Sequence, residues 1–299
     1  MKKFCMICGV FFLLTVYGIA QEQKQARTFL DVVYKTSDGV GLTLNLFLPA
    51  AAESKDNIPL LIWLDSGCWY SKKPGGGGFW KSVKALEKGF AVASVRHRNL
   101  GDGYVFPAQI EDIRAAIRYL RAHAKEYGLD PNRFAVSGGS SGGHLACMSG
   151  IADKTFDVGD NLEFSGQANC VIDFFGPAAA HIYLLDLPFR MPDCLFLVLG
   201  AKKINNEPLI NQASRLMESA KKYAPYTYVD KNYAPVLILH GVADKVVPIS
   251  QSVLFYEKLQ KAGVRSQLYV SNTGKHNIST LGSLPDLEKI VFDFLQWKP

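Results

Sequence analysis

The sequence predicts an α/β protein with a mostly parallel sheet and helices on both of its faces. Short apolar or β-branched runs recur along the chain, helical patterns separate them, and 299 residues suffice for one large domain. Apolar residues make up 48% and charged residues 20% of the chain, which excludes an intrinsically disordered protein. The formal net charge of +6 is small and spread along the chain, so we expect no nucleic-acid partner.

The strands are expected as one antiparallel pair followed by parallel strands. Residues 29–34 and 42–48 alternate apolar and polar side chains around Asp38-Gly39, which predicts the antiparallel pair. Six further runs suit buried parallel strands: Leu60–Leu64, Ala91–Val95, Phe134–Ser137, Val171–Phe175, Val236–His240 and Gln267–Val270.

Helical patterns fill the segments between these runs. The clearest extends from Pro107 to Gly128 and places four apolar residues along one face: Ile110, Ile113, Ile117 and Leu120. Others are expected at about 249–262 and 285–297. In such folds the chemistry collects at the carboxyl ends of the parallel strands, so functional residues are sought directly after strands.

The first twenty residues have the pattern of an export signal. A basic start precedes an apolar run over residues 10–16, and small residues at 18 and 20 suit cleavage before Gln21. An uncleaved membrane anchor is the alternative, although the apolar run is short for a span. We expect a signal peptide over 1–20, one domain over 21–299, no stable membrane insertion after cleavage, and a periplasmic or secreted protein.

Four cysteines would remain after such a cleavage. They are Cys68, Cys147, Cys170 and Cys194. An oxidising compartment permits up to two disulfides, whereas a chain of this length can also keep buried free thiols. The sequence leaves the pairing open.

A candidate nucleophile follows the predicted strand Phe134–Ser137. The segment Gly138-Gly139-Ser140-Ser141-Gly142-Gly143 contains G-x-S-x-G centred on Ser140, and an apolar helical pattern begins directly after it. This strand–turn–helix context is typical of a nucleophile elbow, in which glycines allow a tight turn and the serine hydroxyl projects from the sheet. Centring the motif on Ser140 places the Ser141 amide where an oxyanion donor is needed. The alternatives are the second register, centred on Ser141, and a glycine-rich turn that serves only helix packing.

A serine nucleophile needs a histidine base, and the base needs an orienting carboxylate. Asp244 comes directly after the predicted strand Val236–His240, and His276 lies in the loop after Gln267–Val270. One helix and one strand separate the two, so we expect them on adjacent strand ends, in the chain order Ser, Asp, His. Asp173, at the end of the strand after the elbow, is the rival acid.

The loop after Leu60–Leu64 carries a more specific resemblance. It reads Asp65-Ser66-Gly67-Cys68-Trp69-Tyr70, and with the elbow, the His-Gly-x-x-Asp loop and His276 it resembles the α/β-hydrolase superfamily. Within it, the chain is similar to secreted bacterial acetyl and feruloyl esterases close to the hormone-sensitive-lipase-like group. In that group the loop usually reads His-Gly-Gly-Gly-Trp, so this chain departs at Asp65, Ser66 and Cys68.

The resemblance implies the remaining members of the site. The oxyanion-hole amides would be those of Gly67, Cys68 and Ser141, and Trp69 and Tyr70 are candidate substrate-binding residues. It also implies a hydrolase that uses neither a metal nor another cofactor. Arg98 and Asp112 are expected to form a structural ion pair.

The regular alternation of strand and helix lapses over residues 176–230. An excursion at this point suggests a cap over the active-site edge, or plain packing onto the domain. Together these features predict a secreted serine carboxylesterase that removes short acyl groups, acetyl foremost, from plant polysaccharide or oligosaccharide. The alternatives are a feruloyl esterase, a serine exopeptidase of the prolyl-oligopeptidase type, and a catalytically silent carbohydrate-binding relative. The sequence does not indicate an oligomeric state.

Overall fold

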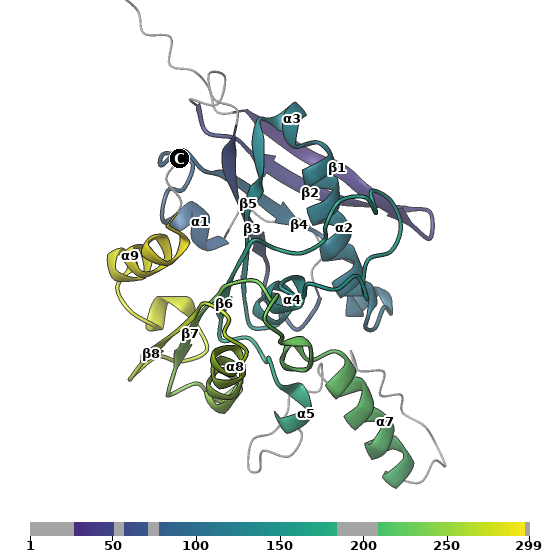
Figure 1. Cartoon of the computed structure of the whole chain (residues 1–299), viewed down its shortest axis with the longest axis vertical. Helices are drawn as coiled ribbons and strands as arrows, with labels where there is room; N and C mark the ends of the chain where they lie inside the picture. Colours follow the sequence, from purple (N-terminus) through teal and green to yellow (C-terminus); the bar gives the residue numbers. More distant parts are fainter. Residues whose placement is uncertain (1–26, 51–56, 71–77, 184–208, 297–299) are drawn as a thin grey trace, which may run out of the picture.

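Eight strands form one sheet in the order β1-β2-β4-β3-β5-β6-β7-β8 in the computed structural model, which describes residues 27–50, 57–70, 78–183 and 209–296 (Figure 1). Their bounds are β1 Thr28–Ser37, β2 Val40–Phe47, β3 Ile58–Leu64, β4 Ala91–Val95, β5 Leu129–Gly139, β6 Cys170–Phe174, β7 Val236–Gly241 and β8 Ser266–Ser271. Strand β2 pairs antiparallel with β1 and β4, and every other neighbouring pair is parallel. The predicted fold class is therefore confirmed, and each predicted run lies on a strand. The predicted signal segment 1–20 lies outside the described residues.

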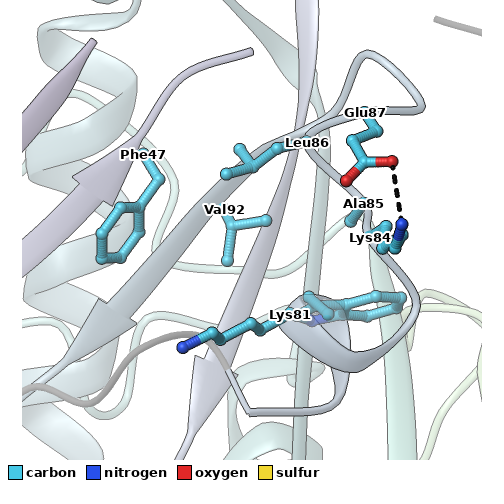
Figure 2. A pocket seen from close by; sticks show the side chains of 8 residues that line it. Phe47, Lys81, Lys84, Ala85, Leu86, Glu87 and Val92 are labelled. Atoms are coloured by element: carbon cyan, nitrogen blue, oxygen red, sulfur yellow. Dashed lines mark ion pairs between the residues drawn. The ribbon is translucent and has the colours of Figure 1, made fainter. Parts of the chain in front are cut away.

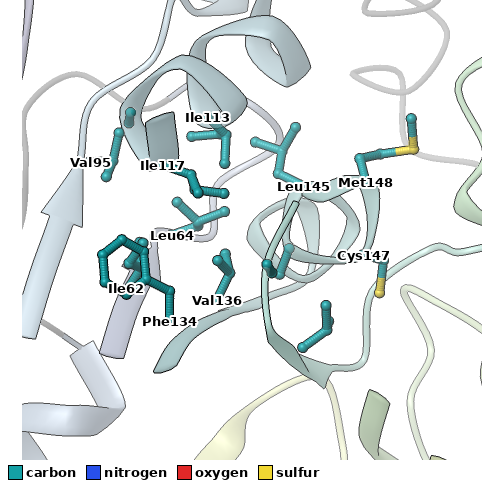
Figure 3. Packing of buried hydrophobic residues seen from close by; sticks show 14 of the residues in the cluster. Ile62, Leu64, Val95, Ile113, Ile117, Phe134, Val136, Leu145, Cys147 and Met148 are labelled. Atoms are coloured by element: carbon teal, nitrogen blue, oxygen red, sulfur yellow. The ribbon is translucent and has the colours of Figure 1, made fainter. Parts of the chain in front are cut away.

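Helices cover both faces of the sheet. On one face, α1 (Gly78–Ser82) and α9 (Leu284–Leu295) share a buried apolar cluster with alternate residues of β3, such as Leu61 and Trp63. On the other face, α2 (Ala108–Ala122), α4 (Ser141–Ser149) and α8 (Ser250–Lys261) contribute buried residues to a second apolar cluster, which includes Ile62 and Leu64 of the same strand. Figure 3 shows this second core, in which residues of α2 and α4 meet the strands. Because both faces are covered, β3 is buried along its whole length.

The long helix expected from Pro107 to Gly128 is interrupted. Helix α2 ends at Ala122, His123 leaves the helical conformation, and α3 follows as a separate turn over Ala124–Tyr127. The His123 ring stacks on Tyr119 with 4.1 Å between centroids, and its Nδ1 lies 2.9 Å from the Tyr119 carbonyl oxygen. The Tyr119 carbonyl also accepts the His123 backbone amide at 3.0 Å, so the ring nitrogen adds a second contact to this carbonyl at the break, which local periodicity does not reveal.

Arg98 and Asp112 form the structural ion pair that the sequence predicted. The Arg98 Nε donates to Asp112 Oδ2 at 2.9 Å, and the Lys35 ammonium lies 2.7 Å from Asp112 Oδ1. Asp112 is fully buried, so these two cations compensate a carboxylate that would otherwise be costly to keep there.

The predicted insertion over 176–230 is described only in part. Its described elements are α5 (Ala180–Tyr183), α7 (Leu209–Lys222) and the 3-10 turn η3 (Pro225–Tyr228), and residues 184–208 lie outside the described ranges. Figure 1 shows α5 and α7 beyond the ends of the parallel strands. No helix in the described part of the chain is both long and apolar enough to cross a membrane.

Candidate active site

Ser140 occupies the sharp turn between β5 and α4. Its backbone has φ 54° and ψ −121°, a strained conformation for a residue with a Cβ. The turn can be this tight because glycines flank it: a Cβ at Gly142 would lie 2.3 Å from the Leu64 carbonyl oxygen. The Ser140 amide donates to the Phe174 carbonyl of β6 at 2.9 Å, which holds the strained residue against the sheet. This is the predicted elbow geometry.

His276 connects Ser140 to Asp244. The His276 Nδ1 lies 2.7 Å from Asp244 Oδ2, and its Nε2 lies 2.9 Å from Ser140 Oγ. With the Nδ1 proton donated to the carboxylate, Nε2 accepts the serine hydroxyl proton. The three residues follow β5, β7 and β8, so the structure brings together the side chains that the chain order and strand ends predicted.

Asp244 is held as a carboxylate by a dense set of donors. Burial alone would raise its pKa, but hydrogen bonds from His240 and His276 and from the backbone hold that pKa well below its ordinary value. The amides of Val246 and Val247 donate to Oδ1 at 2.8 Å and 3.0 Å. A permanently ionised Asp244 can therefore orient His276 and stabilise the imidazolium that forms when Ser140 loses its proton.

Asp173, the rival acid, lies elsewhere. It is fully buried in β6, beneath the elbow, where its Oδ1 accepts the Gly176 amide at 2.8 Å. Burial raises its pKa to about 6, against weaker lowering by that amide and by nearby His240 and Cys147. Because His276 already pairs with Asp244, the geometry favours Asp244 as the orienting acid.

The loop after β3 has an unusual backbone. Gly67, Cys68 and Trp69 all have positive φ angles, of 122°, 55° and 61°. The Ser66 Oγ donates to the Gly139 carbonyl at 2.9 Å, which fixes this loop to the elbow. On the other side, the Ser141 amide belongs to the first turn of α4, where backbone N–H groups have no partner within the helix. The two segments that carry the predicted donors, the loop with Gly67 and Cys68 and the first turn of α4 with Ser141, are therefore fixed to each other through Ser66 and the elbow.

The structure settles the state of the three cysteines that it describes. Cys68 is disulfide-bonded, whereas Cys147 and Cys170 are free and buried. The sequence left open whether these cysteines form disulfides or remain free thiols, and the structure shows a disulfide for Cys68 and free thiols for Cys147 and Cys170. Cys194 lies outside the described residues.

The two candidate substrate-binding residues differ in exposure. Tyr70 is 40% exposed, whereas Trp69 is 4% exposed and packs edge-to-face on Phe106 and His144. The structure therefore places Tyr70 at the surface and Trp69 in the core, where its indole supports the loop.

Sequence reasoning missed the part that His144 plays. This buried histidine of α4 donates through Nε2 to the Tyr223 carbonyl at 2.7 Å, and its Nδ1 lies 3.4 Å from the Trp69 indole nitrogen. Burial lowers the pKa of His144 to about 4, so the ring is neutral and can accept the indole N–H. One side chain thus joins the elbow helix, the oxyanion loop and the segment after α7. The only feature of the sequence that could have indicated this bridge is the presence of a histidine inside the apolar run of the elbow helix.

A Ser-His-Asp hydrogen-bond chain at the carboxyl edge of this sheet defines a serine hydrolase of the α/β-hydrolase superfamily. Within the described ranges, no group of three or more His, Cys, Asp or Glu side chains could hold a metal ion. The profile of the BD-FAE family matches residues 44–259, and the chain belongs to this family.

Individual relatives agree with this assignment. A truncated carbohydrate esterase from gut microbiota is 26% identical, with a TM-score of 0.73 over 92% of this chain and 99% of that one. The esterase Est2 of the Planctomycetes species Thermogutta terrifontis, with butyrate bound, is 25% identical with a TM-score of 0.69 over 93% and 97%. The probable carboxylic ester hydrolase LipM of Mycobacterium tuberculosis (strain ATCC 25618 / H37Rv) is 26% identical over 75% of this chain and 50% of its own length. The chain thus spans about half the length of the curated relatives that it matches first.

Proposed function

We propose that this chain is a secreted serine carboxylesterase that removes short acyl groups, acetyl foremost, from plant polysaccharide or oligosaccharide. The observation that carries the proposal is the unbroken hydrogen-bond chain from Ser140 through His276 to the ionised Asp244. Acyl transfer by a serine requires a base within hydrogen-bond reach of the hydroxyl and a carboxylate that orients the base, and this chain supplies both.

In the first half of the reaction, the Ser140 Oγ attacks the ester carbonyl carbon while His276 Nε2 takes the hydroxyl proton. The carbonyl oxygen becomes an oxyanion, which the amides of Gly67, Cys68 and Ser141 stabilise. The C–O bond to the alcohol then breaks, and His276 returns the proton to the departing alcohol oxygen. The products are the free alcohol and an ester between the acyl group and Ser140.

In the second half, water takes the place of the alcohol. His276 removes a proton from the water as the oxygen attacks the acyl carbon, and the same amides hold the new oxyanion. The bond to Ser140 Oγ breaks, His276 protonates that oxygen, and the free acid leaves. Asp244 remains ionised throughout and holds the imidazole in one orientation.

Four observations support the choice of substrate and compartment. The similar gut-microbiota structure is a carbohydrate esterase, and the similar Thermogutta terrifontis esterase binds butyrate, a short acyl group. The first twenty residues have the export pattern described above, and a disulfide at Cys68 suits an oxidising compartment.

Hydrolysis of 4-nitrophenyl acetate by the protein and by its Ser140→Ala variant tests the chemistry. Butyrate and ferulate esters measured beside it rank the acyl groups, and acetate release from acetylated xylan tests the polymer. We expect turnover that depends on Ser140 and favours acetate. Turnover that survives Ser140→Ala would contradict the assigned nucleophile, and a preference for ferulate would replace the acetyl assignment. Detection of a shortened chain in the periplasm or medium tests export.

A further inference from the structure

A groove of about 720 Å³ lies between α1, the loop after His276 and the start of α9. Its floor includes Trp63, Phe79 and Leu287, and its rim includes Ser82, Asn277 and Ser279. The volume is within the range of small-molecule sites in proteins. None of the triad or oxyanion residues lines it, so the reaction as described leaves it unused.

The direction of proton transfer places the leaving alcohol on the side of His276. During acylation the His276 Nε2 gives its proton to the alcohol oxygen, so that oxygen must lie within hydrogen-bond reach of the ring. The rim of the groove begins with Asn277, the residue next to His276. The lining of the groove therefore begins one residue along the chain from the base that protonates the alcohol.

The floor of the same groove is connected to the oxyanion loop. The Trp63 indole N–H donates to Asp65 Oδ1 at 2.7 Å, and Asp65 directly precedes Ser66, which is bonded to the elbow. The groove lining thus includes the loop that follows His276 on one wall and, through Trp63, is bonded to the residue that begins the oxyanion loop on the other.

The rim is held in place by its own hydrogen bonds. The Asn277 Oδ1 accepts the Ser279 amide and hydroxyl, both at 3.0 Å, and the Lys275 amide donates to Thr280 Oγ1 at 2.8 Å. The Asn277 side chain is exposed, so its NH₂ group can donate outward while Oδ1 braces the loop. A preorganised rim of this kind lowers the entropy cost of binding a ligand.

The chemistry of the lining fits a neutral polyhydroxyl ligand. Among the described residues, no charged side chain lines the groove. Serine hydroxyls and the asparagine amide can exchange hydrogen bonds with sugar hydroxyls, and the apolar floor suits the C–H faces of a sugar ring. The groove in Figure 2 differs: it is lined by Lys81, Lys84 and Glu87 around an apolar centre and includes no residue next to the triad.

We propose that the groove between α1 and the His276 loop is the subsite for the glycosyl part of an acylated oligosaccharide. The proposal rests on the proposed esterase function and adds where the alcohol part of the substrate binds. It predicts that the groove contributes to cleavage of acetylated oligosaccharides and not to cleavage of small aryl acetates, whose alcohol is too short to fill it.

Two variants that block the groove from outside the catalytic machinery test this proposal. Ser82→Arg in α1 and Leu284→Arg at the start of α9 each place a long cation on the lining, and Leu284 is 42% exposed, so the fold should tolerate the change. Val253→Arg on α8 is the matched control, because Val253 is a partly exposed apolar helix residue that does not line the groove.

The measured quantity is kcat/KM on 4-nitrophenyl acetate and on acetylated xylo-oligosaccharides. We expect both groove variants to lose about tenfold or more on the oligosaccharides and to stay within about twofold of the wild type on 4-nitrophenyl acetate, with Val253→Arg unchanged on both. Unchanged oligosaccharide cleavage by the groove variants would overturn the subsite and leave the esterase function standing. A wild type that cleaves the aryl ester but not the oligosaccharide would overturn the carbohydrate assignment together with the subsite.

Discussion

The Asp173→Asn variant tests whether Asp173 affects the stability of the protein without taking part in ester hydrolysis. Asp173 is fully buried under Gly143 and Gly176, and its Oδ2 has no hydrogen-bond partner among the described residues. Burial raises its pKa from 3.8 to about 6. The folded protein therefore holds this proton more tightly than the unfolded chain. At neutral pH the buried carboxylate is ionised, which lowers the free energy of unfolding.

The magnitude follows from that pKa. Each pKa unit corresponds to about 1.4 kcal/mol, so the raised pKa lowers the free energy of unfolding by about 3 kcal/mol at pH 7 relative to pH 3. The stabilisation is present below the unfolded pKa near 3.8 and is lost as the pH rises through about 6. Between pH 5 and pH 8 the loss attributable to Asp173 alone is about 1.4 kcal/mol.

Urea unfolding of the wild type and Asp173→Asn across pH 5 to 8 measures this loss. Asparagine keeps the oxygen that accepts the Gly176 amide but does not ionise, so the stability of the variant should fall less with pH, by about 1.4 kcal/mol. Ester hydrolysis should stay within about threefold of the wild type, since His276 pairs with Asp244. Stability curves that run parallel for the two proteins would refute the raised pKa, and a collapse of kcat would restore Asp173 as the orienting acid.

Changes at three further positions test the elbow and its support. Asp244→Asn should lower kcat about 10⁴-fold on 4-nitrophenyl acetate, because the imidazole loses its orienting carboxylate; a loss below tenfold would contradict the triad. His144→Leu should lower kcat more than it changes KM. His144→Gln should recover part of the rate, because glutamine can both donate and accept hydrogen bonds; equal rates for the two variants would show that His144 serves only packing. Gly143→Ala should lower the free energy of unfolding by about 2 kcal/mol or more, as judged by urea midpoints, since its Cβ would lie 2.3 Å from Asp173 Oδ1; an unchanged midpoint would contradict the tight packing.

The parallel strands were predictable because they are buried on both faces. A run such as Leu60–Leu64 has no polar positions, and the structure shows β3 buried throughout. The same logic placed Ser140, Asp244 and His276 after strands, and strand order in a parallel sheet then brings their side chains to one edge. The adjacency of Asp244 and His276 could thus be derived from the sequence, whereas the place of Ser140 beside them followed from the chain order typical of this architecture.

Features that depend on contacts between distant segments could not be derived in this way. The bridge from Trp69 through His144 to Tyr223 joins three segments, and each residue alone reads as ordinary core. The interruption at His123, where the ring stacks on Tyr119 and its Nδ1 contacts the Tyr119 carbonyl, is likewise not encoded by helical periodicity. The groove beside His276 likewise exists only where α1 and the start of α9 come together.

The disulfide at Cys68 has a practical consequence for anyone who makes this protein. Cys68 lies in the loop whose amides we assign to the oxyanion hole, and its backbone is in a positive-φ conformation that costs energy to maintain. A reducing bacterial cytoplasm keeps cysteines as thiols, whereas an oxidising compartment lets this bond form. Preparations from the two sources would therefore differ at the loop next to the nucleophile, and a low rate from cytoplasmic material would describe the preparation rather than the native enzyme.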